Sequence, residues 1–315
     1  MLLRRKSSVL RVFAVLAVAL AGLLQGGAVM ASAADDGTTP QKPVLFYNHS
    51  YAVLDRETAD AIEHSEYLKD FANFQVRTTT GTGGQVWTGR YLMGRETYLE
   101  LFGVGDLAGP DGEFGAAGLG LSVERAGDLA TVTERLPAEG VADPIEFAQT
   151  RDFGDGVPVP WFDAVLTAAT YDAFGAWAME YRPEYFADPR SNTEPASGPG
   201  DVGRERYLSD DYREHLMRDV VSVRIGVTAS DLADTVPLLK AGGLAVRDTA
   251  DGGVVAYDGA TTIRFDAVPR ERAGLRQIQF SLNQSVKERH VEDIGRSDLV
   301  VGPGARAVWT FDGPE

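Results

Sequence analysis

Cysteine is absent from the 315-residue sequence. This absence excludes disulfide bonds, thiol nucleophiles, thiolate metal sites and lipidated cysteines. Catalytic motifs of fixed spacing are absent too, since the sequence contains no nucleophile elbow, P-loop, HExxH helix or kinase signature. The hydrophobic core alone must stabilise the fold, and a chain of this length can bury a core of sufficient size.

Positive charge is scarce outside the N-terminus. Four of the 30 Lys and Arg residues lie within the first eleven positions, so the remaining 26 face 46 Asp and Glu and give a net charge of −20. That charge opposes binding to nucleic acid and to anionic membranes. It permits a cationic partner or a divalent metal without specifying either.

Residues 1–33 are typical of a cleavable signal peptide. Basic residues come first, 13 apolar residues follow from Val12 to Leu24, and Ala31-Ser32-Ala33 supplies the small residues that a signal peptidase recognises. An uncleaved anchor is an alternative, although a membrane-spanning helix needs about 20 apolar residues. Arg4-Arg5 leaves the twin-arginine export route open beside the general one. We expect a secreted, extracellular protein with no membrane insertion after cleavage.

Two stretches divide the rest of the chain. Residues 34–42 are polar and read as a flexible leader, and residues 187–205 are rich in Pro, Gly, Ser and Asn and poor in large apolar residues. The second stretch predicts a linker between two domains, residues 43–186 and residues 206–315, both of ordinary domain size.

The first domain repeats one pattern, a strand followed by a helix and three strands. Asp55 is placed to cap the first helix, and Pro137 and Gly140 end the second. The first copy has strands at 44–54, 74–80, 85–93 and 97–104 around a helix from 55 to about 71. The second copy has strands at 118–123, 145–150, 157–167 and 173–182 around a helix at 126–136.

The second domain contains one further unit of this kind and part of another. The further unit has strands at 221–227, 244–247, 254–257 and 261–268 and a helix at 230–239. Strands at 277–282 and 307–311 belong to the partial unit, whose helix is missing because residues 283–304 are polar and contain glycine. The sequence therefore predicts an α+β fold of tandem βαβββ units followed by a second, related α+β domain.

Paired βαβββ units of this length resemble the vicinal oxygen chelate superfamily, which includes glyoxalases, dioxygenases and bleomycin-resistance proteins. The stretches YNHSYAVLDRETADAI and WTGRYLMGRETYLELF also look like an uncharacterised group of exported actinobacterial proteins of unknown function. The resemblance implies that the two units of the first domain enclose a cleft. In the superfamily, one residue from the first strand and one from the last strand of each unit hold a divalent metal there.

Carried over residue by residue, the resemblance implies at most three metal ligands. Glu100 and Glu180 occupy the closing-strand positions, whereas Gly118 occupies the fourth position and has no side chain to offer. His49 lies one residue away from the expected position on the first strand, where Asn48 stands. A one-residue shift turns a strand side chain to the opposite face, so His49 needs a β-bulge to point inward.

A structural alternative is that both glutamates form ion pairs and bind no metal. Arginines near them in sequence are Arg77, Arg90 and Arg95 for Glu100 and Arg182 for Glu180.

The preferred function is binding of a small molecule in the cleft without catalysis. Alternation along a strand places Tyr98, Glu100 and Phe102 on one face, and with Glu180 they are the predicted ligand-binding residues. The alternative is a divalent-metal-dependent lyase, isomerase or dioxygenase in which Glu100 and Glu180 are catalytic and His49 joins them at the metal. An extracellular interaction module is the second alternative. No cofactor is certain, and a divalent metal is the one that the resemblance implies.

Overall fold

The computed structural model describes residues 42–314. The signal peptide and all but the last residue of the leader lie outside the described residues. The first unit has the predicted order of elements, and its helical part is two helices because Ser65 ends the first and caps the second, accepting a hydrogen bond from the Leu68 amide at 3.2 Å. The unit comprises β1 (Phe46–Leu54), α1 (Arg56–His64), α2 (Glu66–Phe71), β2 (Asn73–Gly81), β3 (Val86–Met93) and β4 (Tyr98–Gly103).

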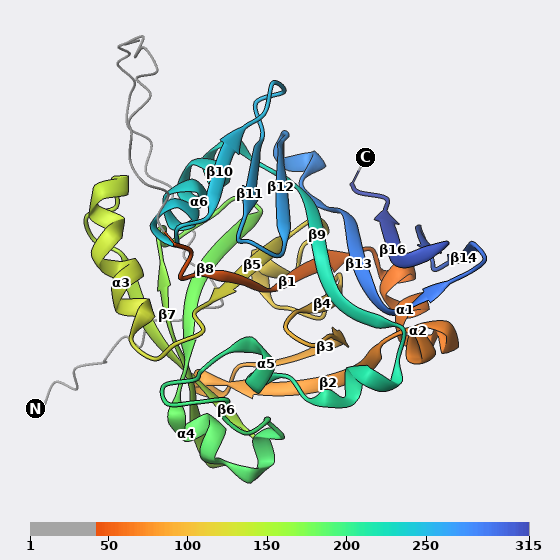
Figure 1. Ribbon diagram of the computed structural model, residues 1–315. Helices are drawn as coiled ribbons and strands as arrows, with labels where there is room; N and C mark the ends of the chain where they lie inside the picture. Colours follow the sequence, from red (N-terminus) through yellow and green to blue (C-terminus); the bar gives the residue numbers. More distant parts are fainter. Residues whose placement is uncertain (1–41, 315) are drawn as a thin grey trace, which may run out of the picture.

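The second unit repeats this order and closes a barrel with the first. Parallel pairs join β1 to β4 and β5 to β8, while antiparallel pairs join the two units. The barrel order is β1-β4-β3-β2-β6-β7-β8-β5, so each unit contributes one contiguous half (Figure 1). The second unit comprises β5 (Ala117–Ser122), α3 (Asp128–Arg135), β6 (Ile145–Asp152), β7 (Pro158–Leu166) and β8 (Phe174–Tyr181).

A second, open sheet of eight strands follows, in the order β10-β11-β12-β9-β13-β16-β15-β14. The third unit of the chain comprises β9 (Met217–Val227), α6 (Ala229–Ala241), β10 (Ala245–Asp248), β11 (Val254–Tyr257) and β12 (Thr262–Ala267). The fourth comprises β13 (Gly274–Val286), β14 (His290–Asp293), β15 (Ser297–Val301) and β16 (Gly304–Phe311), and no helix follows its first strand.

The predicted fold class is confirmed, with tandem βαβββ units and a second, related α+β part. Sequence reasoning missed β14 and β15, two short strands within residues 283–304. β14 has no buried residue, so it has no apolar alternation to mark it as a strand, and β15 buries one face over only five residues.

Residues 187–205 lie between the two sheets in the chain, where the sequence predicts a linker, and they pack against the barrel. They run between the short helices α4 (Pro183–Ala187) and α5 (Arg204–Tyr207). Asp201 forms a β-bridge with Arg125, and Arg204 donates to the Tyr47 carbonyl at 2.6 Å and to Glu124. Specific contacts therefore hold this segment on the barrel, although its content of Pro, Gly, Ser and Asn is typical of a linker.

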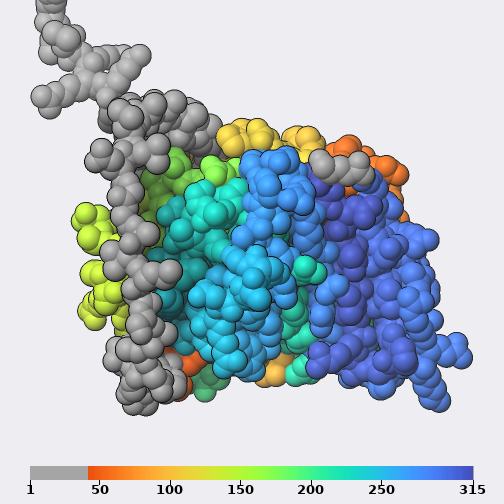
Figure 2. Space-filling model, turned by 90° about the horizontal axis from the view of Figure 1, so that it is seen from above, coloured from red at the N-terminus to blue at the C-terminus, as the bar shows by residue number. Residues whose placement is uncertain are grey.

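One hydrophobic core runs through both sheets. It contains Ile62 of α1, Leu121 of β5, Val223 of β9 and Phe280 of β13, each fully buried. Viewed from above, the segments of the second sheet form most of the visible face (Figure 2). In the described part of the chain, no helix has the length and apolarity needed to cross a membrane.

Candidate functional site

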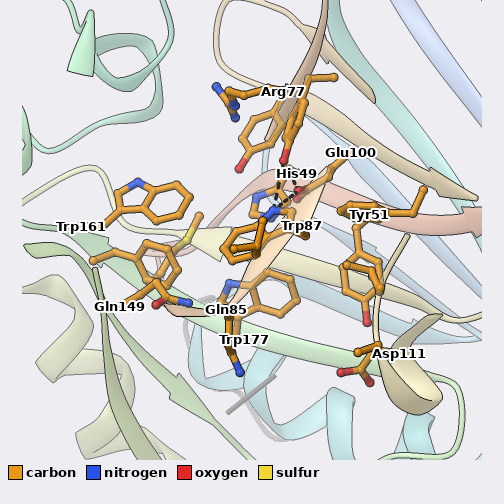
Figure 3. A pocket seen from close by; sticks show the side chains of 18 of the residues that line it. His49, Tyr51, Arg77, Gln85, Trp87, Glu100, Asp111, Gln149, Trp161 and Trp177 are labelled. Atoms are coloured by element: carbon orange, nitrogen blue, oxygen red, sulfur yellow. Dashed lines mark hydrogen bonds between the residues drawn. The ribbon is translucent and has the colours of Figure 1, made fainter. Parts of the chain in front are cut away.

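A cavity of about 210 Å³ lies among the barrel strands of both units. Cavities of about 150 Å³ can already hold a benzene ring, so this one has room for a small flat molecule. Strand alternation is confirmed for three predicted residues, because Tyr98, Glu100 and Phe102 all line it. Its side chains surround the space from several strands (Figure 3). The lining rings are Tyr51, Trp87, Tyr91, Tyr98, Phe102, Trp161, Phe162, Trp177 and Tyr181, besides His49.

Glu100 is one of the two described carboxylates that line this pocket, the other being Asp111. Its Oε1 accepts hydrogen bonds from Trp87 Nε1, at 3.1 Å, and from the Tyr91 hydroxyl. Burial raises the pKa of Glu100, while the Tyr91 bond and the charge of Arg77 act in the opposite direction. The carboxylate is thus oriented by two aromatic donors in a nonpolar setting.

His49 points into the pocket because β1 contains the bulge that its position requires. Tyr47 pairs with Leu121 and His49 with the next residue, Gly120, so Asn48 is the extra residue. The Asn48 Oδ1 accepts a hydrogen bond from His49 Nδ1 at 2.8 Å, which leaves Nε2 unprotonated. Burial lowers the pKa of His49 to about 3, so the imidazole is neutral at pH 7.

Glycines on β5 make room for the rings of β1. A Cβ at Gly118 would lie 2.1 Å from Tyr51 Cε1, and one at Gly120 would lie 2.4 Å from His49 Cε1. The Tyr51 ring therefore fills the place where a fourth ligand would project. Any side chain at Gly118 requires Tyr51 to move.

Glu180 does not reach the pocket, and its prediction as a ligand-binding residue is wrong. Met179 and Tyr181 line the cavity, and alternation turns Glu180 to the outer face of the barrel. There its carboxylate accepts from the amides of Gly127, at 2.9 Å, and Leu129, at 3.2 Å. These amides begin α3, so the glutamate caps a helix whose own N-cap residue offers no side chain.

The predicted metal set of His49, Glu100 and Glu180 does not come together. Two of its members line the pocket and the third lies on the other side of the barrel wall. Within residues 42–314, no group of three His, Asp or Glu side chains is placed to hold a metal ion. The residues present therefore do not fit a divalent metal of the kind that the resemblance implies.

The predicted ion pairs are also wrong. Arg90 forms salt bridges with Glu63 and Asp106, and Arg95 with Glu96 and Glu205. The fourth candidate, Arg182, pairs with Asp163 and Glu184 on the outer face. Arg77 lines the pocket and lies over the Tyr91 ring, 4.1 Å from its centroid, with no salt bridge to a described carboxylate.

Sequence reasoning missed three polar contributors to the pocket, Gln85, Asp111 and Gln149. Asp111 accepts a hydrogen bond from the Tyr171 hydroxyl at 2.5 Å, and burial raises the pKa of this aspartate. Gln149 of β6 accepts from the Thr82 amide at 2.8 Å. No local signal identifies these residues, because aspartate and glutamine are ordinary in turns and strands and only barrel closure brings them to the cavity.

Comparisons with solved structures give distant likenesses. A hypothetical protein from Staphylococcus aureus shares 11% identity at a TM-score of 0.47, with 82% of this chain and all of that one covered. A Mn(II)-bound glyoxalase from Novosphingobium aromaticivorans shares 9% identity at a TM-score of 0.40, with 84% of this chain and 81% of that one covered. At these TM-scores neither likeness bears on function. No curated protein matches the chain. The sequence model of one family matches residues 47–311, and the chain accordingly belongs to the family of unknown function DUF5829.

Proposed function

We propose that this protein binds a small, flat, largely apolar molecule in the barrel pocket and releases it unchanged. The observation that carries the proposal is the lining itself, nine aromatic rings around a cavity of about 210 Å³. Aromatic walls suit a planar ligand because ring stacking adds to the gain from apolar burial.

The pocket lining includes polar groups in fixed positions, which favours a ligand that carries a few heteroatoms. Glu100 is held by Tyr91 and Trp87, so it can accept a hydrogen bond from a ligand in one defined orientation. Trp161 Nε1 is buried and has no hydrogen-bond partner among residues 42–314. A ligand acceptor beside this indole would satisfy a donor that is otherwise costly to bury.

Binding without chemistry is favoured because the positions implied as metal ligands make other contacts. Glu180 stabilises the start of α3, and the position of Gly118 is taken up by Tyr51. The neutral His49 stacks against Tyr98 with ring centroids 4.4 Å apart, and its Nδ1 is engaged by Asn48. The metal-dependent enzyme considered as an alternative needs both Glu100 and Glu180 at the pocket, and only Glu100 lines it.

We place this binding outside the cytoplasm, as the signal-peptide pattern of residues 1–33 implies. A secreted protein that holds a small molecule and leaves it intact would carry or sequester that molecule. The proposed location rests on the sequence alone.

The test is titration of the purified protein with 2-naphthamide, a flat neutral probe, followed by calorimetry and by quenching of tryptophan fluorescence. We expect saturable binding at one site. Trp87→Ala should weaken it at least tenfold, because the half-buried Trp87 forms a wall of the pocket. Tyr257→Ala, at an exposed aromatic of β11, is the matched control.

Absence of saturable binding to a panel of flat probes would refute the proposal. So would recovery of a chemically altered probe after prolonged incubation, which would instead support an enzyme. Mass spectrometry of the recovered probe distinguishes these results.

A further inference from the structure

A second cavity, of about 90 Å³, adjoins the aromatic pocket and differs from it in chemistry. The two cavities share one lining residue, Arg77 of β2. Arg151 of β6 also lines the second cavity, together with the amide or hydroxyl side chains of Asn73, Gln75, Ser191, Asn192 and Ser209. None of the described residues that line it is Asp or Glu, although acids outnumber bases 46 to 30 in the chain.

Both arginines of this cavity lack a carboxylate partner among the described residues. Arg151 donates to the Tyr185 hydroxyl at 2.7 Å and lies over the Phe153 ring, 4.7 Å from its centroid. Arg77 lies over Tyr91, and its buried Nε has no hydrogen-bond partner in the part of the chain that the structure describes. Aromatic faces thus hold the two guanidinium groups in place without a salt bridge to a described carboxylate, although the charge of Arg77 also acts on Glu100 in the adjoining pocket.

This arrangement contrasts with four other arginines on or beside the barrel. Arg90, Arg95, Arg182 and Arg190 each form salt bridges with two carboxylates. Guanidinium groups have a planar array of donors that matches carboxylate and phosphate oxygens. Two such groups around a small polar cavity therefore form a site for an anion.

We propose that the second cavity is an anion subsite, in which Arg77 and Arg151 bind the carboxylate, sulfate or phosphate group of the ligand whose flat part occupies the aromatic pocket. This inference rests on the proposed function and names its ligand class, a planar acid. Figure 3 shows Arg77 at one end of the pocket and Asp111 at the other, so the acid end of the ligand lies at Arg77, away from the second carboxylate.

The experiment compares 2-naphthoate with 2-naphthamide, which have nearly the same shape and differ in charge. We expect the acid to bind at least tenfold more tightly than the amide at pH 7.5 and low ionic strength. Arg151→Gln should reduce that preference to less than threefold, because it removes a positive charge that only the acid can use. Arg306→Gln, at an exposed arginine of β16, controls for the lost positive charge.

Sodium sulfate at constant ionic strength separates a free anion from one carried by the ligand. If sulfate raises the melting temperature of the wild type but not of Arg151→Gln, and competes with 2-naphthoate, both occupy the same subsite. If sulfate has no effect while the preference for naphthoate holds, the subsite takes only an anion attached to the flat molecule.

Equal affinity for the acid and the amide in the wild type would overturn the subsite and leave the proposed function standing. A preference for the acid that persists in Arg151→Gln would overturn it as well. Failure of both probes to bind would refute the proposed function. The melting temperature of each variant, measured without ligand, shows whether it is folded.

Discussion

The imidazole of His49 is stacked on the phenol ring of Tyr98, with centroids 4.4 Å apart and planes inclined by 11°. Trp177 contacts the same imidazole edge-on at 5.3 Å. The histidine is 5% exposed, and its burial lowers the pKa from 6.5 to about 3. Burial thus favours the neutral form of the ring.

We predict that His49 causes a loss of stability as the pH falls. Its folded-state pKa lies below the unfolded value, so its contribution is present above pH 6.5 and is lost between pH 6.5 and about 3. At about 1.4 kcal/mol per pKa unit, the full loss is on the order of 3 to 5 kcal/mol. Urea unfolding at pH 7.5, 5.5 and 4.5 should show His49→Gln losing less stability than wild type. If the free energies of unfolding of His49→Gln and wild type fell in parallel with pH, the prediction would be contradicted. His64→Gln, at the exposed end of α1, is the control.

Glu100 should have the opposite dependence on pH. Because burial raises its folded-state pKa, the folded protein loses stability as the pH rises from the unfolded value through the folded one. Glu100→Gln keeps an acceptor for Tyr91 and Trp87 and cannot ionise. We therefore expect the free energy of unfolding of this variant, relative to that of wild type, to be higher at pH 8 than at pH 4. Urea unfolding at the two pH values measures it. A gain that is the same at both pH values would show that the carboxylate is not destabilised by burial.

Gly118 should not tolerate alanine. The added Cβ would lie 2.1 Å from Tyr51 Cε1 and 3.0 Å from the Trp177 ring, so both rings would have to move. We expect Gly118→Ala to lower the free energy of unfolding by about 1 to 3 kcal/mol. Gly198→Ala is the matched control, since nothing lies within 4 Å of the Cβ position there. Equal stability of the two variants would mean that Tyr51 does not occupy the space as described.

Glu180 should matter for stability and not for binding. Glu180→Ala removes the acceptor for the Gly127 and Leu129 amides, and loss of a helix cap costs about 0.5 to 2 kcal/mol. We expect a lower urea midpoint with unchanged affinity for 2-naphthamide. Glu134→Ala, at an exposed position of α3, should change neither quantity. Weaker probe binding by Glu180→Ala would return this residue to the pocket.

The layout of the fold follows from local sequence. Alternating apolar residues define most of the strands, and Asp55 caps α1 as predicted, accepting from the Thr58 amide at 2.9 Å. Alternation within one strand also correctly placed Tyr98, Glu100 and Phe102 on a shared face. These features depend on a few neighbouring residues, whose preferences the sequence displays directly.

The composition of the site depends on contacts between distant strands. Glu180 faces outward because its neighbours Met179 and Tyr181 line the pocket, and successive side chains of a strand point to opposite faces. The bulge at Asn48 and the filling of the Gly118 position by Tyr51 arise where β1 pairs with β5.

The sequence by itself determined three βαβββ units and part of a fourth, a shortage of positive charge and a strand face with one glutamate between two aromatic rings. Only the tertiary structure decided which side chains share a cavity. Arg77 and Arg151 are 74 positions apart in the chain and line the same small space. Barrel closure brings them together beside aromatic rings, where local sequence predicted an ion pair for one of them.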